Sequence, residues 1–178
     1  MPHSYRSFHS PAVEYLQAHV PDRETRIIDL GAGDGSFGAM VRPHFPNTDA
    51  VEIWAPYVEQ FGLERIYRRI RVGRAQDLAP EDIRGSVLVM GDVLEHLEVP
   101  EAQAFLRRFW DAGARMLLVI VPWLYEQGPQ HPDVLQYGNP HEVHQQPDLT
   151  SGVFAVRYPD LTLVGQDAHC GFYVRDRA

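Results

Sequence analysis

A glycine-rich turn between a predicted strand and a predicted helix constrains the fold of this chain more than any other feature. Residues 26–30 form a short β-branched and apolar run, and residues 36–42 fit a short helix. Gly31, Gly33 and Gly35 lie between them. Glycine adopts positive φ angles freely and lets a ligand approach the backbone closely. The helix N-terminus behind the turn offers free N–H groups and a positive potential, so the turn is predicted to bind a ligand.

Strands and helices alternate along the rest of the chain. Residues 86–90 read SVLVM without alternation, which is typical of a parallel strand covered on both faces. Helices are expected at residues 10–19 and 100–112, and further strands at residues 50–53, 70–73, 116–121, 153–157, 161–165 and 171–174. Residues 128–147 are rich in Pro, Gly, His and Gln without periodicity, so a long functional loop or lid is expected there. This order predicts a doubly wound α/β fold.

Composition restricts the class of protein. The 178 residues fit one domain, residues 1–178, with a full hydrophobic core. The one cysteine, Cys170, excludes an internal disulfide and a cysteine-rich zinc site. No apolar run is long enough for a membrane span and no secretory signal is visible, so we expect a cytoplasmic protein. The formal net charge of -8 makes the chain a poor partner for duplex nucleic acid or an anionic membrane, and a small-molecule partner is expected.

The spacing of the glycines distinguishes between two kinds of nucleotide ligand. The dinucleotide fingerprint G-x-G-x-x-G needs a glycine at position 36, where this chain has Ser36. The pattern present is G-x-G-x-G, with an acid, Asp29, two residues before it. A nicotinamide cofactor is still the alternative, because Glu52 at the end of the second predicted strand has the spacing of an acid that binds ribose hydroxyls.

The stretch from Asp29 to Gly35 resembles motif I of the class I (Rossmann-like) S-adenosylmethionine-dependent methyltransferases. The resemblance implies a mostly parallel seven-stranded sheet in the order 3-2-1-4-5-7-6, with strand seven antiparallel and helices on both faces. It also implies that the loop holds the aminoacyl part of the cofactor, that Glu52 accepts hydrogen bonds from both ribose hydroxyls, and that Asp77 contacts adenine. The cofactor-binding residues implied in this way are Asp29, Gly31, Ala32, Gly33, Gly35, Glu52, Ile53, Asp77 and Asp92.

A second cluster of polar residues follows the fourth predicted strand. Asp92, Glu95 and His96 would share one face of a helical turn, because residues i, i+3 and i+4 of a helix are neighbours. Two carboxylates and an imidazole can bind a divalent ion or position a general base. Alternatively, the Glu95–His96 pair only caps the next helix. Ligands bind at the carboxyl ends of parallel strands in such sheets, so a catalytic site is expected here.

This cluster resembles the E-x-x-E-H motif with a distant histidine that occurs in two groups of methyltransferases. These are the terminal-ribose small-RNA 2′-O-methyltransferases and the ubiquinone-pathway O-methyltransferases. The resemblance implies a divalent ion, Mg²⁺ or another, that engages substrate hydroxyls. Asp92, Glu95 and His96 match the first three positions. His144 matches the fourth, while Asp92 stands where glutamate is usual and is shorter by one methylene.

These interpretations predict an enzyme that transfers a methyl group from S-adenosylmethionine to a hydroxyl of a small molecule. The sulfonium activates the methyl group, so the protein aligns the reactants and removes a proton. His96 or His144 is the expected base, with Asp92 and Glu95 orienting the substrate or holding the metal. A histidine base should lose activity as the pH falls through about pH 6–7.

Three alternative functions fit the same residues: another reaction of this cofactor such as a cyclisation, methylation of an RNA end, and cofactor binding without catalysis. The acidic charge argues against RNA, and the intact glycine turn argues against an inactive protein. Trp123 and Tyr125 are expected to form an apolar wall of the substrate pocket, or Trp123 to fill the core edge. Tyr5 and Phe8 are candidates to fold over the cofactor. Surface positions are expected for His131 and His141.

Overall fold

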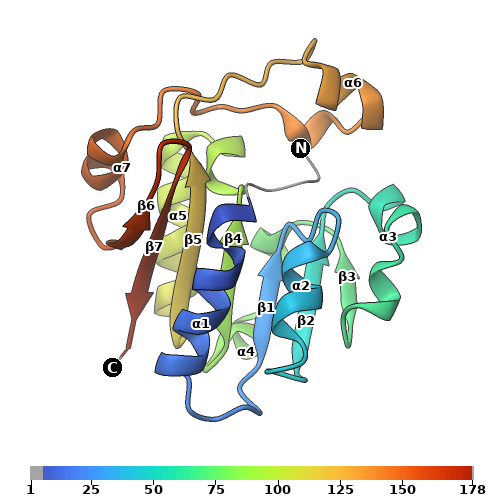
Figure 1. Cartoon of the computed structure of the whole chain (residues 1–178), viewed down its shortest axis with the longest axis vertical. Helices are drawn as coiled ribbons and strands as arrows, with labels where there is room; N and C mark the ends of the chain where they lie inside the picture. The colour runs from blue at the N-terminus through green and yellow to red at the C-terminus, as the bar shows by residue number, and fades with distance from the viewer. Residues whose placement is uncertain (1–5, 178) are drawn as a thin grey trace.

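A computed structural model describes residues 6–177, which form a seven-stranded sheet with helices on both faces (Figure 1). The strand order is β3-β2-β1-β4-β5-β7-β6, which confirms the predicted order. Strands β1 to β5 pair in parallel, and β7 pairs antiparallel with both β5 and β6. The strands are β1 (Ile27–Leu30), β2 (Thr48–Glu52), β3 (Ile70–Val72), β4 (Val87–Gly91), β5 (Met116–Pro122), β6 (Thr162–Gln166) and β7 (Cys170–Asp176).

Helices cover both faces of this sheet. Figure 1 places α1 and α2 on one face and α4 and α5 on the other. The α-helices are α1 (His9–His19), α2 (Ser36–Val41), α3 (Pro56–Gln60), α4 (Pro80–Ile83), α5 (Val99–Asp111), α6 (Pro132–Tyr137) and α7 (Ser151–Arg157). Short 3-10 helices are η1 (Arg6–Phe8), η2 (Leu63–Arg65), η3 (Ala75–Asp77), η4 (Leu94–His96) and η5 (Pro140–Glu142).

The two largest hydrophobic clusters, one on each face of the sheet, result from the alternation of side chains along the buried strands. In β4, Leu88 and Met90 belong to the core that includes α5. Val87 and Val89 belong to the core that includes α1 and α2. Both faces of the strand are covered, which explains why its sequence has no polar alternation.

The 153–157 segment, predicted to be a strand, lies in helix α7. Thr150 is the N-cap residue, and its side-chain oxygen accepts a hydrogen bond from the backbone N–H of Val153 at 3.2 Å. Such a cap satisfies one of the free N–H groups at the start of a helix. The β-branched residues of the segment favoured the prediction of a strand, but the Thr150 cap stabilises a helix there. The prediction is therefore wrong, and β6 and β7 are the late strands of the described chain.

The 128–147 segment is only partly a loop. It contains α6, which begins with Pro132 after the N-cap residue His131, and η5, which follows the N-cap residue Asn139. Proline suits the first position of a helix because its missing N–H would be unpaired there in any case. Figure 1 shows the segment crossing above the carboxyl ends of the parallel strands. It lies at the end of the sheet where a ligand is expected.

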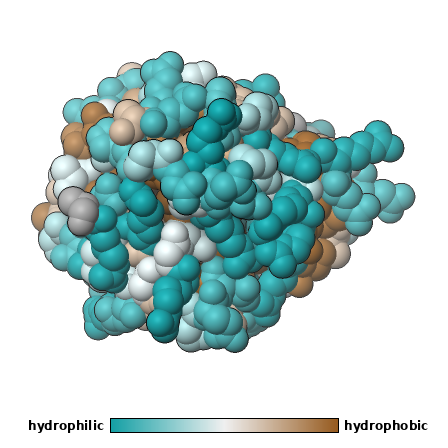
Figure 2. Space-filling model, turned by 90° about the horizontal axis from the view of Figure 1, so that it is seen from below, coloured by the Kyte–Doolittle hydropathy of each residue, from teal (hydrophilic) through white to brown (hydrophobic). Residues whose placement is uncertain are grey.

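The end of the molecule where the parallel strands begin lies opposite the 128–147 segment. Figure 2, a view from below, shows mostly hydrophilic residues at the end where the parallel strands begin. Among residues 6–177, no helix combines the length and the apolar character that a bilayer crossing requires.

Candidate active site

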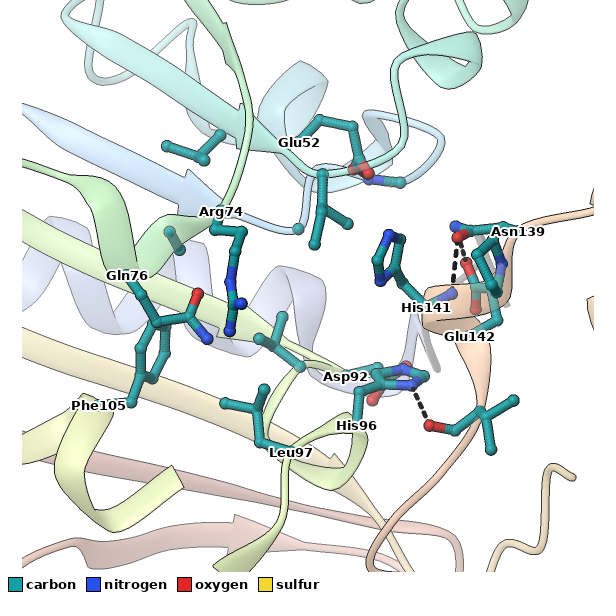
Figure 3. A pocket seen from close by; sticks show the side chains of 18 of the residues that line it. Glu52, Arg74, Gln76, Asp92, His96, Leu97, Phe105, Asn139, His141 and Glu142 are labelled. Carbon is teal, nitrogen blue, oxygen red and sulfur yellow. Dashed lines mark hydrogen bonds between the residues drawn. The ribbon is translucent and has the colours of Figure 1, made fainter. Parts of the chain in front are cut away.

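A cavity of about 510 Å³ opens at the carboxyl ends of the parallel strands (Figure 3). Its walls come from the turns that follow β1, β2, β3 and β4, and from the 128–147 segment around η5. Pockets of this size hold cofactors and drug-sized molecules. Glycines and polar residues of the wall include Gly31, Gly33, Glu52, Arg74, Gln76, Asp92, His96, Asn139, His141 and Glu142.

Glu52, at the end of β2, lines the cavity and also holds the glycine turn. One carboxylate oxygen accepts a hydrogen bond from the backbone N–H of Gly33 at 3.0 Å, and the other accepts one from the N–H of Trp54 at 2.8 Å. Burial raises the pKa of this carboxyl, and the two backbone hydrogen bonds oppose the rise. Glu52 therefore joins two walls of the cavity, the end of β2 and the turn after β1.

The glycines of the turn have different surroundings. Gly31 and Gly33 line the large cavity with φ angles of 77° and 52°. A Cβ atom on Gly31 would lie 2.9 Å from the Val93 side chain, so a larger residue would displace the wall. Gly35, with a φ angle of 76°, is absent from the described wall of this cavity, and a Cβ atom on it would lie 2.6 Å from Ile66. Gly35 thus lets the turn pack closely before α2.

Two further residues predicted to bind the cofactor, Asp29 and Ala32, lie behind the turn in the wall of a small second cavity. The hydroxyl of Tyr67 donates a hydrogen bond of 2.5 Å to the Asp29 carboxylate. Asp29 is completely buried, and burial raises the pKa of its carboxyl to about 7. The structure places both residues beneath the glycine turn rather than in the described wall of the large cavity.

The turn after β3 supplies two wall residues that the sequence reasoning missed. Arg74 and Gln76 line the large cavity, and both donate hydrogen bonds to one oxygen of Glu101, at 2.9 and 3.0 Å. Asp77, the predicted adenine contact, is not among the described residues of that wall. Ile53 does line the cavity. The position directly after a predicted strand was the available signal for Arg74 and Gln76.

Glu95, His96 and His144 come together at the end of β4. One ligand atom from each lies within 4.8 Å of the others. Nε2 of His96 lies 4.0 Å from a carboxylate oxygen of Glu95, and the ring centroids of His96 and His144 are 4.6 Å apart. The structure therefore brings together three of the four residues that the sequence predicted for catalysis or metal binding.

Asp92, the fourth, is outside this group of mutually close ligand atoms in the described chain. The prediction assumed an α-helical turn that begins at Asp92. In the structure Asp92 has a φ angle of 51°, in the left-handed region, and a 3-10 helix, η4, follows it. The four-residue pattern is therefore not confirmed. Asp92 instead lines both the large cavity and a third cavity of about 10 Å³ that borders Glu95 and His144.

The hydrogen bonds of the two histidines determine which ring nitrogen carries the proton. Nδ1 of His96 lies 3.3 Å from the carbonyl oxygen of Val143, and Nδ1 of His144 lies 2.9 Å from that of Tyr125. A carbonyl oxygen only accepts hydrogen bonds, so Nδ1 is protonated and Nε2 keeps a lone pair. Burial lowers the pKa of His96 to about 3 and that of His144 to about 4. Both rings are therefore neutral at neutral pH.

The carboxylate of Glu95 is completely buried. Neither of its oxygens accepts a well-formed hydrogen bond from residues 6–177. Burial raises the pKa of this carboxyl well above its ordinary value, and the negative charge of Asp92 adds to the rise. A buried, unpaired carboxylate is unfavourable, and a cation beside it would remove the penalty. Together with two neutral imidazoles, Glu95 forms a donor set that fits a divalent cation.

A buried network attaches the 128–147 segment to α3. The Tyr57 hydroxyl donates a hydrogen bond to the Glu142 carboxylate at 3.0 Å. The side chain of Gln127 donates to the Glu142 carbonyl oxygen at 2.6 Å, and that of Asn139 donates to the Glu142 carboxylate at 3.3 Å. Figure 3 shows Asn139, His141 and Glu142 together on one side of the cavity. His141, expected on the surface, is exposed and also lines the cavity.

The aromatic candidates divide between the core and the site. Trp123 packs against Tyr173 at the core edge, with ring centroids 6.2 Å apart. Tyr125 lines the third cavity beside Glu95. The ring of Phe8 packs against the ring of Phe172 in β7, and Phe8 is not in the described wall of the large cavity. Tyr5 lies outside the described residues.

No family model matches the chain, and no curated protein matches its sequence. Magnesium protoporphyrin IX methyltransferase from Synechocystis PCC 6803 has a similar structure, with a TM-score of 0.67 at 12% identity over 98% of this chain and 84% of that one. The methyltransferase domain of the bacterial protein CtHen1 gives 0.63 at 16% identity over 98% and 100%. The 1,6-didemethyltoxoflavin-N1-methyltransferase of Burkholderia thailandensis gives 0.63 at 19% identity over 98% and 80%. This chain has the fold that these methyltransferases share.

Proposed function

We propose that the chain binds S-adenosylmethionine in the large cavity and transfers its methyl group to a hydroxyl of a small molecule. The observation that carries this proposal is a wall common to two sites. Asp92 and His96 line both the large cavity and the third cavity beside Glu95 and His144. A methyl donor in the large cavity and an acceptor hydroxyl at the third cavity would therefore be neighbours.

The chemistry of the large cavity supports this cofactor. Gly31 and Gly33 have positive φ angles and no side chain, so a ligand can approach the backbone of the turn closely. Each oxygen of Glu52 accepts one backbone hydrogen bond and has a further lone pair for a ribose hydroxyl. Leu97 and Phe105 supply apolar wall near Gln76, which suits a purine ring. Two of the solved structures with this fold hold S-adenosylhomocysteine.

Methyl transfer requires alignment and the removal of one proton. The acceptor oxygen attacks the methyl carbon as the carbon–sulfur bond breaks, S-adenosylhomocysteine forms, and the hydroxyl proton passes to a base. With pKa values of about 3 and 4, His96 and His144 are weak bases. We therefore propose that Glu95, His96 and His144 hold a divalent ion such as Mg²⁺ or Mn²⁺, which would lower the pKa of a hydroxyl bound to it so that water could accept the proton. Asp92 would orient the acceptor between the two cavities.

Calorimetric titration tests the cofactor. S-adenosylmethionine and S-adenosylhomocysteine should bind, and NAD should not. The Glu52→Ala variant should bind S-adenosylhomocysteine more weakly by roughly 2–3 kcal/mol, since hydrogen bonds to a charged group are lost. Glu52→Gln keeps an acceptor for Gly33 or Trp54 and should bind with intermediate affinity. Tight NAD binding without binding of the sulfonium cofactor would contradict the assignment.

A product screen with methyl-labelled cofactor tests the acceptor. Small hydroxyl compounds should become labelled, whereas amines and an RNA with a free 3′-terminal ribose should not. Label only in the RNA would replace the small-molecule acceptor by an RNA end. An acceptor that loses a leaving group and closes a ring without gaining label would indicate a cyclisation. A bound cofactor with no product in any arm would favour a noncatalytic role.

A further inference from the structure

The small second cavity under the glycine turn adjoins the large one. Its volume is about 10 Å³, and Gly31 and Gly91 belong to the walls of both cavities. A space of this size holds one water-sized group. The two cavities therefore meet at these glycines, and the second has room for a single small group.

His9, the first residue of α1, lies in the wall of this second cavity. Its side chain is 2% exposed, and its ring packs edge-on against Phe37 with centroids 5.7 Å apart. Nδ1 of His9 has no hydrogen-bond partner among residues 6–177. Burial lowers the pKa of the imidazole, so the ring is neutral at neutral pH, and its Nδ1 is an acceptor when Nε2 carries the proton. Buried polar atoms normally have partners, which indicates that a ligand supplies this one.

The charges around the second cavity favour a cation. Asp29, which is completely buried, and Asp34 are both in its wall. Arg6, which pairs with Asp34 at 2.9 Å, has a side chain that is 65% exposed. An ammonium group offers three N–H donors and one positive charge to these acceptors. A carboxylate in the same place would bring only acceptor oxygens to these acceptors.

We propose that His9 binds the α-ammonium group of S-adenosylmethionine, with Nδ1 accepting one of its hydrogen bonds beside the Asp29 carboxylate. The inference rests on the function proposed above. The ammonium group reaches the second cavity between Gly31 and Gly91. Helix α1 thereby takes part in cofactor recognition, and the site distinguishes ligands that carry an amino acid from other adenosine derivatives.

Calorimetric titration with three adenosine compounds tests this role of His9. S-adenosylhomocysteine carries the α-ammonium group, its desamino analogue lacks only that group, and 5′-methylthioadenosine lacks the whole aminoacyl part. The His9→Leu variant should bind S-adenosylhomocysteine roughly tenfold or more weakly than the unaltered protein, because a hydrogen bond to a charged group is lost. Its affinity for the other two compounds should be unchanged.

The His9→Asn variant is the matched control, since its amide oxygen lies close to the position of Nδ1. It should recover most of the affinity for S-adenosylhomocysteine. The assignment is overturned if His9→Leu binds S-adenosylhomocysteine normally, if all three compounds are weakened equally, or if the desamino analogue is weakened as much as S-adenosylhomocysteine. Failure of the unaltered protein to bind any of the three compounds would instead refute the proposed function.

Discussion

Glu95 has the surroundings that most restrict the chemistry of the site. Its carboxylate is buried beside His96 and His144, and a divalent ion would give it the partner that residues 6–177 do not provide. We expect chelation to abolish methyl transfer and Mg²⁺, Mn²⁺ or Co²⁺ to restore it. We also expect bound Co²⁺ to give a visible absorption band, from which the metal affinity can be measured. The His144→Ala variant should bind Co²⁺ at least tenfold more weakly, because one of three ligands is lost.

His19→Ala is the matched control for this prediction, since His19 is an exposed histidine at the end of α1. It should leave metal binding unchanged. Activity that survives chelation would assign the proton transfer to the histidines alone. Because burial lowers the pKa of His144 to about 4, a histidine base would lose activity near that pH rather than at the pH 6–7 or so typical of an exposed imidazole.

Asp92 shows how far single residues can be placed from sequence. Its position after a buried strand correctly predicted the carboxyl edge of the sheet, and it lines the large cavity. Its direction depended on the local backbone, which turns left-handed at Asp92 before η4. Aspartate is among the few non-glycine residues that are enriched at such angles, but its presence alone does not fix the backbone there. The exclusion of Asp92 from the group of Glu95, His96 and His144 therefore could not be predicted.

At the scale of elements, a buried hydrogen bond attaches the 128–147 segment, which forms part of the cavity wall, to α3. Tyr57→Phe removes the hydroxyl that binds the buried Glu142. We expect backbone amides 132–143 to exchange hydrogen at least several-fold faster, and the free energy of unfolding to fall by about 1–3 kcal/mol, because one of the hydrogen bonds to a buried carboxylate is lost. Mass spectrometry of exchanged peptides measures the first effect.

The Tyr15→Phe variant is the matched control for this exchange experiment. It also deletes a tyrosine hydroxyl, but on α1, which lies apart from α3 (Figure 1). Its 132–143 amides should exchange as in the unaltered protein. Unchanged exchange in Tyr57→Phe would mean that other contacts, such as the ring pair of Tyr57 and Tyr137, hold the segment by themselves.

Elements differ in how well their sequences specify them. The spacing of Phe105 and Phe109 in α5 follows the helical period, and that helix was predicted within about a turn. Helix α7 has β-branched residues and a single buried side chain, Phe154, so its pattern carried little information. In α6, Pro132 after His131 starts the helix, a signal that the polar composition of the segment obscured.

At the scale of the whole molecule, the residues predicted the class of fold but not the neighbours of each strand. Strands β4 and β5 are both buried on both faces, so either could occupy any central position in the sheet. The strand order was predicted only from the resemblance of the glycine turn to motif I of the methyltransferases. The edge that holds the site followed from chain direction, because the parallel strands all end there.

Asp29 is expected to make the stability of the whole fold depend on pH. Burial raises the pKa of its carboxyl from 3.8 to about 7. Between these values the folded chain retains the proton and the unfolded chain has released it. The Asp29 contribution to the free energy of unfolding therefore declines as the pH rises through this window and is constant above about pH 7. The Asp29→Asn variant cannot ionise and keeps an acceptor for Tyr67.

Urea unfolding of the unaltered protein and of Asp29→Asn at about pH 5 and about pH 8 measures this contribution. The difference in unfolding free energy between the two proteins should change by about 2 kcal/mol, with the unaltered protein losing stability at the higher pH, since one pKa unit corresponds to roughly 1.4 kcal/mol. Asp22→Asn replaces an exposed acid and should follow the unaltered protein. If the unfolding free energy of Asp29→Asn changes with pH as that of the unaltered protein does, the carboxyl of Asp29 ionises as it does in the unfolded chain. The second cavity would then already hold a compensating positive charge in solution.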